Sequence, residues 1–441
     1  MKWLKRSLIA LVVLLVIAAA IPFFITLDNY IPRIEKEASA KLKEPVTIKS
    51  IKFSALPTPH ITVDGITVGK TEDIKLGKVT VTPELFSLFS ATKVIRSIEL
   101  NSLVLTQKAI DKIPVWSKSD DAAAPPLARI ESIRLENALV KLDKTNFGPF
   151  DGNVSLNAKG EPVEARITTQ DGKLKISVKP DKSNYLVDMS AKSWKPPFGP
   201  PIEFDELIIK GVATLNNADF SEISAKLYGG TVNGKGTAAW QKGMQVKGSF
   251  DVNQVELKSL VPLVSPGTNM SGRLTAKPVF SAAAADPNKL LHALHLETPF
   301  DVHNGVLHGI DIQQAATNLI KQGASGGETR FEKLSGHLVR DRGAHQFTHL
   351  NIASGSLAAD GNVTISPKQE LSGRVNAQVK ALGTSAKIPL NVAGTIHSPL
   401  LYPTGATIVG AAIGTVLMPG VGTGLGAKAG QAIEGLFGKK K

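Results

Sequence analysis

Residues 46–68 read VTIKSIKFSALPTPHITVDGITV, and this stretch sets the fold class of the chain. Apolar and polar residues alternate on both sides of a turn that carries Pro57 and Pro59. Side chains two residues apart share one face of a strand, so the alternation predicts two strands that each have one apolar face. Short patterns of this kind, separated by Gly, Asn, Asp and Pro, continue along the chain and predict a mainly β protein.

A six-residue pattern inside this stretch occurs three times. The copies are Ile48-Lys-Ser-Ile51-Lys-Phe53, Ile95-Arg-Ser-Ile98-Glu-Leu100 and Ile130-Glu-Ser-Ile133-Arg-Leu135. In each copy the first isoleucine is out of phase with the two later apolar residues, which predicts a bulge or bend at the serine. The unequal spacing of the copies argues against a regular solenoid and favours a sheet that grows by similar strands with variable loops.

An uncharged apolar run from Ser7 to Leu27 precedes the first strand pattern. It matches the ~20 residues that a helix needs to cross a bilayer. Lys2, Lys5 and Arg6 come before it, which predicts a cytoplasmic N-terminus with the rest of the chain on the far side. The predicted anchor residues are Leu8, Leu11, Val13, Leu15, Ile17, Phe23 and Phe24. A signal peptide cleaved near Ala18-Ala19-Ala20 is the alternative, although the apolar run continues past that site.

Three segments have helical patterns. Residues Asn29 to Leu42 predict a short helix, which Pro45 prevents from continuing. Pro83 to Phe89 predict a shorter helix, and Asp311 to Gln322 predict the longest interior helix. Linkers are predicted at 112–126, 195–201 and 281–288 because these segments are rich in Pro, Gly, Ser and Ala. The predicted regions are 1–27 (basic stub and anchor), 28–111 (first β region), 112–126 (linker), 127–280 (middle β region), 289–403 (last β region) and 404–441 (Gly-rich tail with a basic end).

Composition excludes several kinds of chemistry. The 441-residue chain has no cysteine, which rules out disulfides, thiol catalysis and cysteine metal sites. Its formal net charge of +13 is dispersed, and no basic module typical of nucleic-acid binding is present, so we expect no nucleic-acid partner. A Lys-rich, solvated β surface explains the charge, and attraction to anionic lipid headgroups is a second interpretation.

No catalytic motif has the structural context it needs. Gly323-Ala-Ser325-Gly-Gly327 matches a nucleophile elbow, but a predicted helix precedes it where a strand is required. His292 and His295 lie at helical spacing, yet no third ligand follows at the spacing of a zinc site. We therefore expect a protein that is not an enzyme and has no cofactor or metal, and a hydrolase that uses Ser325 remains the alternative.

The C-terminal end has a separate signal. Residues Ser398 to Ala427 carry no charge, and their glycines recur at four-residue spacing in small-xxx-small pairs. Pro419 divides the run into halves that are each too short to span a bilayer simply. Membrane contact, assisted by Lys439-Lys440-Lys441, and a buried or flexible tail are both compatible with this pattern.

The order of several motifs resembles the AsmA family, a branch of the bridge-like lipid transfer superfamily. Near the N-terminus the similar motifs are Pro45-Val-Thr-Ile48, Phe53, Pro57-Thr-Pro59 and Ile61-Thr-Val63-Asp-Gly65-Ile-Thr-Val68. In the middle and C-terminal parts they are Leu227-Tyr-Gly-Gly230, Asn304 to Ile312, Thr329 to Gly336, Ser356 to Ile365 and Ile388 to Thr395. The resemblance implies a periplasmic protein anchored in the bacterial inner membrane by a single N-terminal transmembrane helix. It also implies an extended, curled antiparallel β-sheet with an apolar groove and a few short helices.

What the resemblance implies for function is outer-membrane biogenesis and phospholipid movement between the two membranes. The expected partners are the inner membrane and phospholipid acyl chains, together with outer-membrane or periplasmic proteins. By alternation, the candidate groove-lining residues are Val46, Phe53, Ile61, Val63, Ile98 and Leu100. The alternative for each of these residues is an ordinary place in the hydrophobic core. A non-enzymatic scaffold or assembly factor for outer-membrane proteins is the alternative function.

Overall fold

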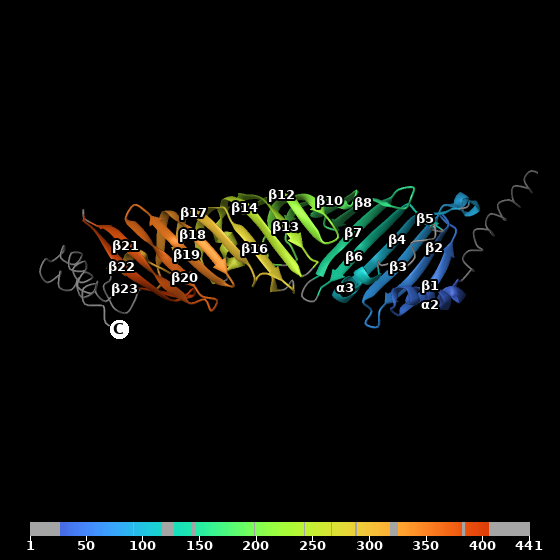
Figure 1. Cartoon of the computed structure of the whole chain (residues 1–441), viewed down its shortest axis with the longest axis horizontal. Coiled ribbons are helices and arrows are strands. Elements are labelled where there is room, and N and C mark those ends of the chain that lie inside the picture. Colours follow the sequence, from blue (N-terminus) through green and yellow to red (C-terminus); the bar gives the residue numbers. More distant parts are fainter. Residues whose placement is uncertain are drawn as a thin grey trace, which may run out of the picture. The chain divides into compact units, whose positions relative to one another are not determined.

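The computed structural model describes most of the chain as a mainly β protein with a few short helices (Figure 1). Its described residues form 23 strands, which divide between two compact units. Unit 1 ends at Ala191 and includes 197–199, and unit 2 comprises 192–196 and the residues from Pro200 onward. The described residues are 27–90, 92–116, 128–142, 146–197, 199–241, 243–265, 267–286, 289–317, 325–381 and 384–404. No helix within these ranges is long and apolar enough to span a bilayer.

Unit 1 carries the first nine strands and most of the tenth, whose last three residues (192–194) belong to unit 2. Its helical elements are η2 (Asp28–Tyr30), α2 (Ile31–Leu42), η3 (Leu85–Phe89) and α3 (Gln107–Trp116). Its strands are β1 (Val46–Ser54), β2 (His60–Val68), β3 (Ile74–Pro83), β4 (Lys93–Thr106), β5 (Ala128–Ile130), β6 (Ser132–Lys141), β7 (Asn146–Leu156), β8 (Pro162–Thr169), β9 (Leu174–Asp181) and β10 (Asn184–Trp194). Strands β1 to β4 form one antiparallel meander, and β6 to β10 form a second.

The two meanders join through parallel pairing, which corrects the expectation of a purely antiparallel sheet. Strand β4 pairs in parallel with both β5 and β6. Two copies of the repeated pattern meet there in exact step, with Ile95, Ile98 and Leu100 opposite Ile130, Ile133 and Leu135. Parallel neighbours need a crossover connection, and the chain supplies one in α3 and the residues that follow it.

The predicted bulge of the repeat lies one residue before its serine. In the second copy the β3–β4 register shifts at Arg96, and in the third copy Glu131 separates β5 from β6. The first copy has no register shift against β2. An extra residue in two of the three copies thus brings the first isoleucine back into phase with the later apolar residues.

Side chains of η2 and α2 accept hydrogen bonds from the outer edge of β1. The backbone N–H groups of Val46, Ile48 and Ile51 donate to the Ser39 hydroxyl at 2.9 Å, the Glu35 carboxylate at 2.7 Å and the Asp28 carboxylate at 2.9 Å, respectively. Unpaired edge groups invite association with other strands, so these side chains prevent the sheet from extending there. The helix ends at Leu42, the predicted last residue, where Lys43 takes a left-handed φ of +52° two residues before Pro45.

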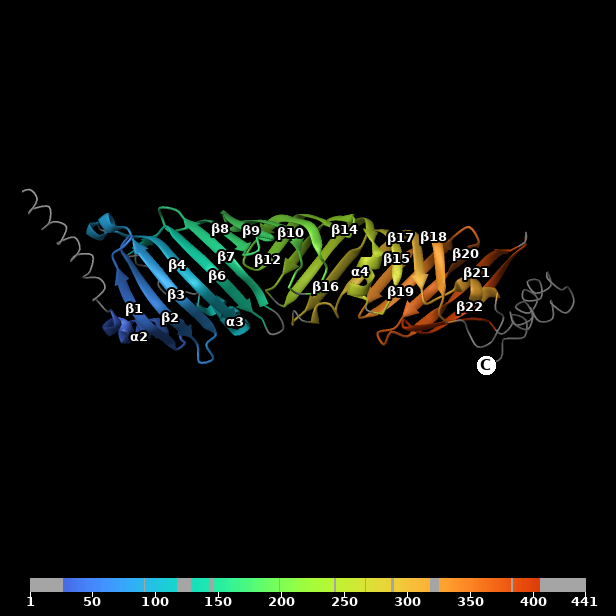
Figure 2. The same cartoon turned by 180° about the vertical axis from the view of Figure 1, so that it is seen from behind.

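Unit 2 carries the other thirteen strands. Its helices are α4 (Leu257–Val264) and α5 (Ile312–Thr317), and α4 packs beside β15 (Figure 2). Its strands are β11 (Phe204–Ala213), β12 (Asn217–Leu227), β13 (Gly230–Ala239), β14 (Met244–Glu256), β15 (Met270–Ala276), β16 (Val279–Ala284), β17 (His295–His308), β18 (Glu328–Asp341), β19 (Ala344–Ala353), β20 (Leu357–Ile365), β21 (Leu371–Ala381), β22 (Thr384–Thr395) and β23 (Ser398–Pro403).

The strands of unit 2 follow one another as an antiparallel meander. The exception is that β15 and β16 together occupy one position between β14 and β17, interrupted at Lys277 and Pro278. Proline lacks the N–H that a central strand position needs, so the ladder breaks there. Strand β16 extends to Ala284, so its last four residues occupy the first half of the boundary predicted at 281–288.

The largest core lies in unit 2, where α5 covers the sheet. Helix α5 packs against β18, β21, β22 and β23. Its Ile312, Ala315 and Ala316 are at most 4% exposed and join a cluster of buried residues from β17 to β23. The helix predicted at 311–322 is thus confirmed over Ile312–Thr317, and its remaining residues lie outside the described ranges.

The other two predicted elements begin or end at different residues. The short helix predicted from Pro83 begins at Leu85, because the Glu84 side chain caps it by accepting from the N–H groups of Phe86 and Ser87. The predicted linker from Lys112 begins inside α3, which extends to Trp116.

Candidate functional site

The candidate site is an apolar face on the sheet of unit 1, built from residues that pair directly across nine strands. The register aligns a first row of side chains along one line perpendicular to the strands. This first row consists of Phe53, Ile61, Val81, Ile98, Ile133, Val154, Ala165, Val178 and Val187. Residues directly opposite one another in a ladder share a face, so the row is one continuous apolar stripe.

A second row lies two residues away along every strand and so on the same face. It consists of Ile51, Val63, Val79, Leu100, Leu135, Gly152, Ile167, Ile176 and Met189. Its one glycine makes room for a neighbour, because a Cβ at Gly152 would lie 2.9 Å from the Leu135 Cδ1. We call the first and second rows together the apolar face.

The row between these two contains only polar side chains and therefore lies on the opposite face. It consists of Lys52, Thr62, Thr80, Glu99, Arg134, Asn153, Arg166, Ser177 and Asp188. Glu99 and Arg134, which stand opposite each other on the parallel pair, form an ion pair at 3.6 Å. The sheet of unit 1 thus has one apolar and one polar face over its nine paired strands.

The side chains of the apolar face are only half-buried. Ile51 is 3% exposed, and every other member of the two rows is of intermediate exposure. Among the described residues, α2 packs on β1, α3 and η3 pack on β4, and no helix packs broadly over β6 to β9. A sheet normally buries its apolar face against another layer, so a half-buried face on this scale is a candidate interaction surface.

A line of irregular backbone crosses the first five paired strands and ends these two rows. Lys49, Gly65, Gly77, Ser102 and Asn137 face one another across β1, β2, β3, β4 and β6, and the ladder skips each of these pairs. Gly65, Ser102 and Asn137 adopt φ values of +64°, +56° and +54°. Such left-handed residues bend a strand and change which alternate residues face inward.

Beyond this line the apolar residues continue in the opposite phase. A third row there consists of Val46, Val68, Ile74, Leu105, Val140 and Phe147. Val46 is 7% exposed and Ile51 is 3% exposed, whereas their neighbours Thr47 and Lys52 are exposed. The change of phase therefore keeps both sets of apolar side chains on the same face of the sheet.

The structure brings the six candidate groove residues into these rows. Phe53, Ile61 and Ile98 lie in the first row, Val63 and Leu100 in the second, and Val46 in the third. Sequence reasoning missed the remaining members of the rows. Ile133 and Leu135 carried a usable signal, because they occupy the same repeat positions as Ile98 and Leu100. The predicted anchor residues lie outside the described ranges.

A charged cluster fastens α3 to the turns at the third-row end of the strands. The Lys112 Nζ lies 2.8 Å from the Asp73 carboxylate and 2.6 Å from the Glu44 carboxylate. The hydrogen bond from Lys112, followed by that from Thr71, lowers the pKa of Asp73. The hydrogen bonds to Asp73 and Glu44 raise the pKa of Lys112. Asp73 is 3% exposed, so this cluster is a structural tie.

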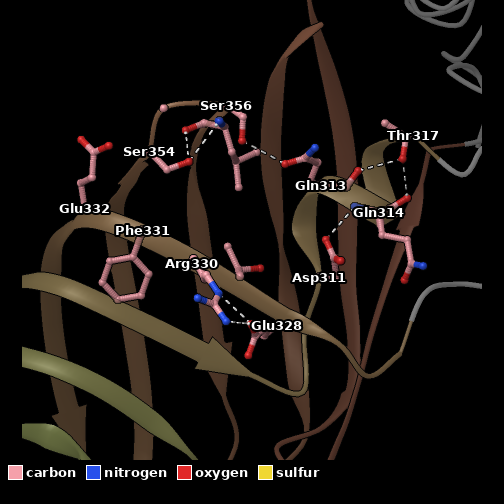
Figure 3. Close-up of a pocket in the computed structure, with 13 residues that line it drawn as sticks. Asp311, Gln313, Gln314, Thr317, Glu328, Arg330, Phe331, Glu332, Ser354 and Ser356 are labelled. Atoms are coloured by element: carbon pink, nitrogen blue, oxygen red, sulfur yellow. Dashed lines mark hydrogen bonds and ion pairs between the residues drawn. The ribbon is translucent and has the colours of Figure 1, made fainter.

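A separate pocket of about 720 Å³ lies beside α5 in unit 2 (Figure 3). Its polar groups bond mostly to one another: the Asp311 carboxylate accepts from Gln314 N at 2.7 Å, and Glu328 pairs with Arg330 at 2.7 Å. Ser325 is exposed and does not line this pocket. Within the described residues no group of three or more acidic or histidine side chains is placed to hold a metal.

Comparison with known proteins identifies the family. The AsmA family model matches residues 1–117 and 207–379, which together exceed half of the chain. The chain belongs to the AsmA family. The two matched segments of this AsmA-family protein leave out 118–206, the part that carries β5 to β10. Comparison with curated proteins and with solved structures gives no match.

Proposed function

We propose that this AsmA-family protein carries phospholipids between the inner and outer membranes of the cell envelope. Family membership supports a role in outer-membrane assembly or lipid transport. The observation that carries the more specific proposal is the apolar face of unit 1, which is half-buried over nine paired strands and has polar side chains behind it. In the proposed state the sheet curls, and this face becomes the wall of a groove for acyl chains.

The energetics of such a groove suit transport. Each methylene removed from water contributes about 0.8 kcal/mol, so a lipid tail along the rows is held firmly. The attraction is non-directional, which lets a tail slide from one strand to the next without breaking specific contacts. Nine strands spaced ~4.8 Å apart extend on the order of 40 Å, and a bilayer core is ~30 Å thick for two opposed tails. The face is therefore long enough for at least one acyl chain.

The proposed location follows from the sequence before Asp28. The apolar run from Ser7 to Leu27 serves as a single-pass anchor in the inner membrane, with its basic end in the cytoplasm. Both units then lie in the periplasm. In this proposal the protein performs no chemistry, and a Ser325→Ala variant retains full function in a complementation assay. Loss of function in that variant, at normal protein levels, would instead favour the hydrolase alternative.

The test compares neighbouring positions on opposite faces of one strand. A photo-reactive phenylalanine analogue replaces Val81 on the apolar face or Thr80 on the polar face, in the full-length chain in living cells. After irradiation, mass spectrometry of the purified protein identifies the adducts. We expect phospholipid adducts at position 81 and none at position 80. Equal adducts at both positions, or none at position 81, would contradict the proposal.

One region of the molecule favours the alternative, a scaffold or assembly factor. Beneath α5, the row of Val302, Leu334, Ile352, Ala359 and Ala377 is at most 8% exposed and leaves no apolar surface for a lipid. A filled face of this kind is what a scaffold requires. The same crosslinking experiment distinguishes the two functions, because a scaffold gives protein adducts in place of lipid at position 81.

A further inference from the structure

The short helix η3 presents two phenylalanines almost entirely to solvent. Phe86 is 84% exposed and Phe89 is 93% exposed, and Leu85 beside them is 45% exposed. A 3₁₀-helix has three residues per turn, so Phe86 and Phe89 lie on one side of η3. Phenylalanine is among the residues that proteins most often bury, and a cluster of exposed apolar side chains marks an interaction surface.

Buried polar contacts hold η3 in this orientation. Ser87 is 4% exposed, and its hydroxyl accepts from Val94 N at 2.8 Å and donates to the Glu84 carbonyl at 2.6 Å. The Glu84 carboxylate accepts from Ser87 N at 2.7 Å. The polar side of the turn is thus fixed to the start of β4, while its apolar side faces outward.

The end of the predicted anchor lies at the same end of the sheet. The apolar run finishes at Leu27, whose N–H donates to the Ile51 carbonyl on β1 at 3.3 Å. Ile51 lies two residues before Phe53 on β1. Phe53 pairs with Ile61, and Ile61 pairs with Val81 on β3, which lies four residues before Leu85. The β1–β2 turn is at this end as well, and its Leu56 is 60% exposed. In Figure 1, η3 is the light-blue coil beyond the ends of β3 and β4.

Charge close to η3 favours a lipid surface over an apolar protein surface. Lys93 and Arg96 are exposed on the first residues of β4, directly after η3. Aromatic side chains next to basic ones are typical of segments that lie at the interface of an anionic bilayer. The Glu84 carboxylate caps η3, and the Lys93 Nζ donates to the Ser90 carbonyl at 2.8 Å.

We propose that η3 is a membrane-docking wedge, in which Phe86 and Phe89 enter the interfacial layer of the same bilayer that holds residues 7–27. The wedge is a second membrane contact beyond the anchor, and it holds the first-row end of the apolar face against the lipid surface. It rests on the anchoring part of the proposed function but not on lipid transport. A scaffold docked on the membrane would use it equally well.

Because the chain has no native cysteine, a single introduced cysteine is the only site that a thiol-reactive probe labels. A Phe89→Cys variant of the full-length chain is labelled with an environment-sensitive fluorophore and reconstituted into phosphatidylethanolamine–phosphatidylglycerol vesicles. We expect a blue-shifted emission that headgroup-proximal spin-labelled lipids quench. The matched control is Lys70→Cys, exposed in the β2–β3 turn at the opposite end of the same strands, where we expect water-like emission without quenching.

Two outcomes would overturn the wedge. One is emission from position 89 like that from position 70, and the other is a blue shift that lipid-borne spin labels do not quench, which would indicate a protein contact. The result is independent of lipid transport. Phospholipid adducts at position 81 with an unquenched probe at position 89 would reject the wedge alone, and the reverse combination would reject transport alone.

Discussion

The apolar face of unit 1 and the core beneath α5 in unit 2 are made of the same kind of strand. In both regions apolar residues pair directly across an antiparallel ladder. In unit 1 the rows are half-buried apart from Ile51, whereas the row from Val302 to Ala377 in unit 2 is 0–8% exposed. In unit 2, the six-residue helix α5 packs on β18 and β21 to β23 and contributes Ile312, Ala315 and Ala316 to the buried cluster, which also includes Leu257 of α4.

This comparison shows that an apolar sheet face can be either a closed core or a half-buried surface with no change in strand pattern. What differs is whether a second layer covers it.

The largest contrast is expected from placing a carboxylate at matched alanines. Ala377 is 0% exposed between Ala359 and Ile388, and Ala165 is half-buried between Val154 and Val178. An unpaired buried charge is strongly destabilising, so Ala377→Asp costs about 4 kcal/mol or more. At position 165 the carboxylate reaches water and costs about 1 kcal/mol. Hydrogen exchange of β20–β22 and β7–β9 measures the two effects.

Ala165→Asp carries its own functional control. It should lower the yield of phospholipid adducts at position 81 while leaving the exchange of unit 2 unchanged. If Ala165→Asp unfolds unit 1 as completely as Ala377→Asp unfolds its own region, the face of unit 1 is a closed core, and the distinction between the regions disappears.

A second contrast comes from truncating leucines. Leu390 is 0% exposed in β22, and Leu100 is half-buried in the second row. Leu→Ala in a packed core costs about 2–5 kcal/mol because it leaves a cavity, and we expect Leu390→Ala in that range. Leu100→Ala should cost about 1 kcal/mol, since part of its surface is already hydrated. Urea unfolding followed by region-specific exchange gives both values, and equal losses would contradict the contrast.

Acid should affect the two regions in different pH ranges. Burial, assisted by the charge of Arg340, lowers the pKa of His345 below its ordinary 6.5. The folded state then binds fewer protons than the unfolded chain, so β18 and β19 lose stability as the pH falls below 6.5 toward the folded pKa. The pKa of Asp73 in unit 1 is held below its ordinary 3.8, chiefly by Lys112, so its contribution persists until the pH falls below that value.

Exchange measured at pH 7, 5 and 3.5 checks this order. His345→Asn should remove the loss in β18–β19 between pH 7 and pH 5, whereas His292→Asn, at an exposed position, should not. Asp73→Asn should flatten the acid response of α3 and the β2–β3 turn. Simultaneous loosening of both regions near pH 6 would contradict the assignment.

The smallest effects are expected on the polar faces, where the two regions should behave alike. Glu99 and Arg134 pair at 3.6 Å in unit 1, and Asp301 and Lys333 pair at 2.9 Å in unit 2, all with exposed or partly exposed side chains. Exposed ion pairs contribute about 0–1 kcal/mol, so Arg134→Ala and Lys333→Ala each cost less than that. Double-mutant cycles measure the coupling energy of each pair. A large coupling energy in one region would mean that its polar face also contributes to the difference in stability between the two regions.

The individual strands and helices could be predicted from the sequence more readily than the way in which the strands pair. The alternation at 46–68, the repeated Ile-x-Ser-Ile pattern and the helices after Asn29 and Asp311 are local signals, and the structure has strands or helices at each. The register that aligns Ile98 with Ile133 depends on parallel pairing after a crossover, which no local pattern specifies. For this reason the candidate residues covered β1, β2 and β4 only, although the same rows continue to β10.

The sequence by itself determined that each strand would have one apolar and one polar face, because alternation with a period of two fixes the direction of every side chain. It also determined the family, through motifs in the two matched segments. Only the tertiary structure decided which apolar face is covered. Helix α5 packs on strands β21 to β23, which follow it by more than fifty residues, and long-range packing of this kind depends on the whole fold and not on any segment.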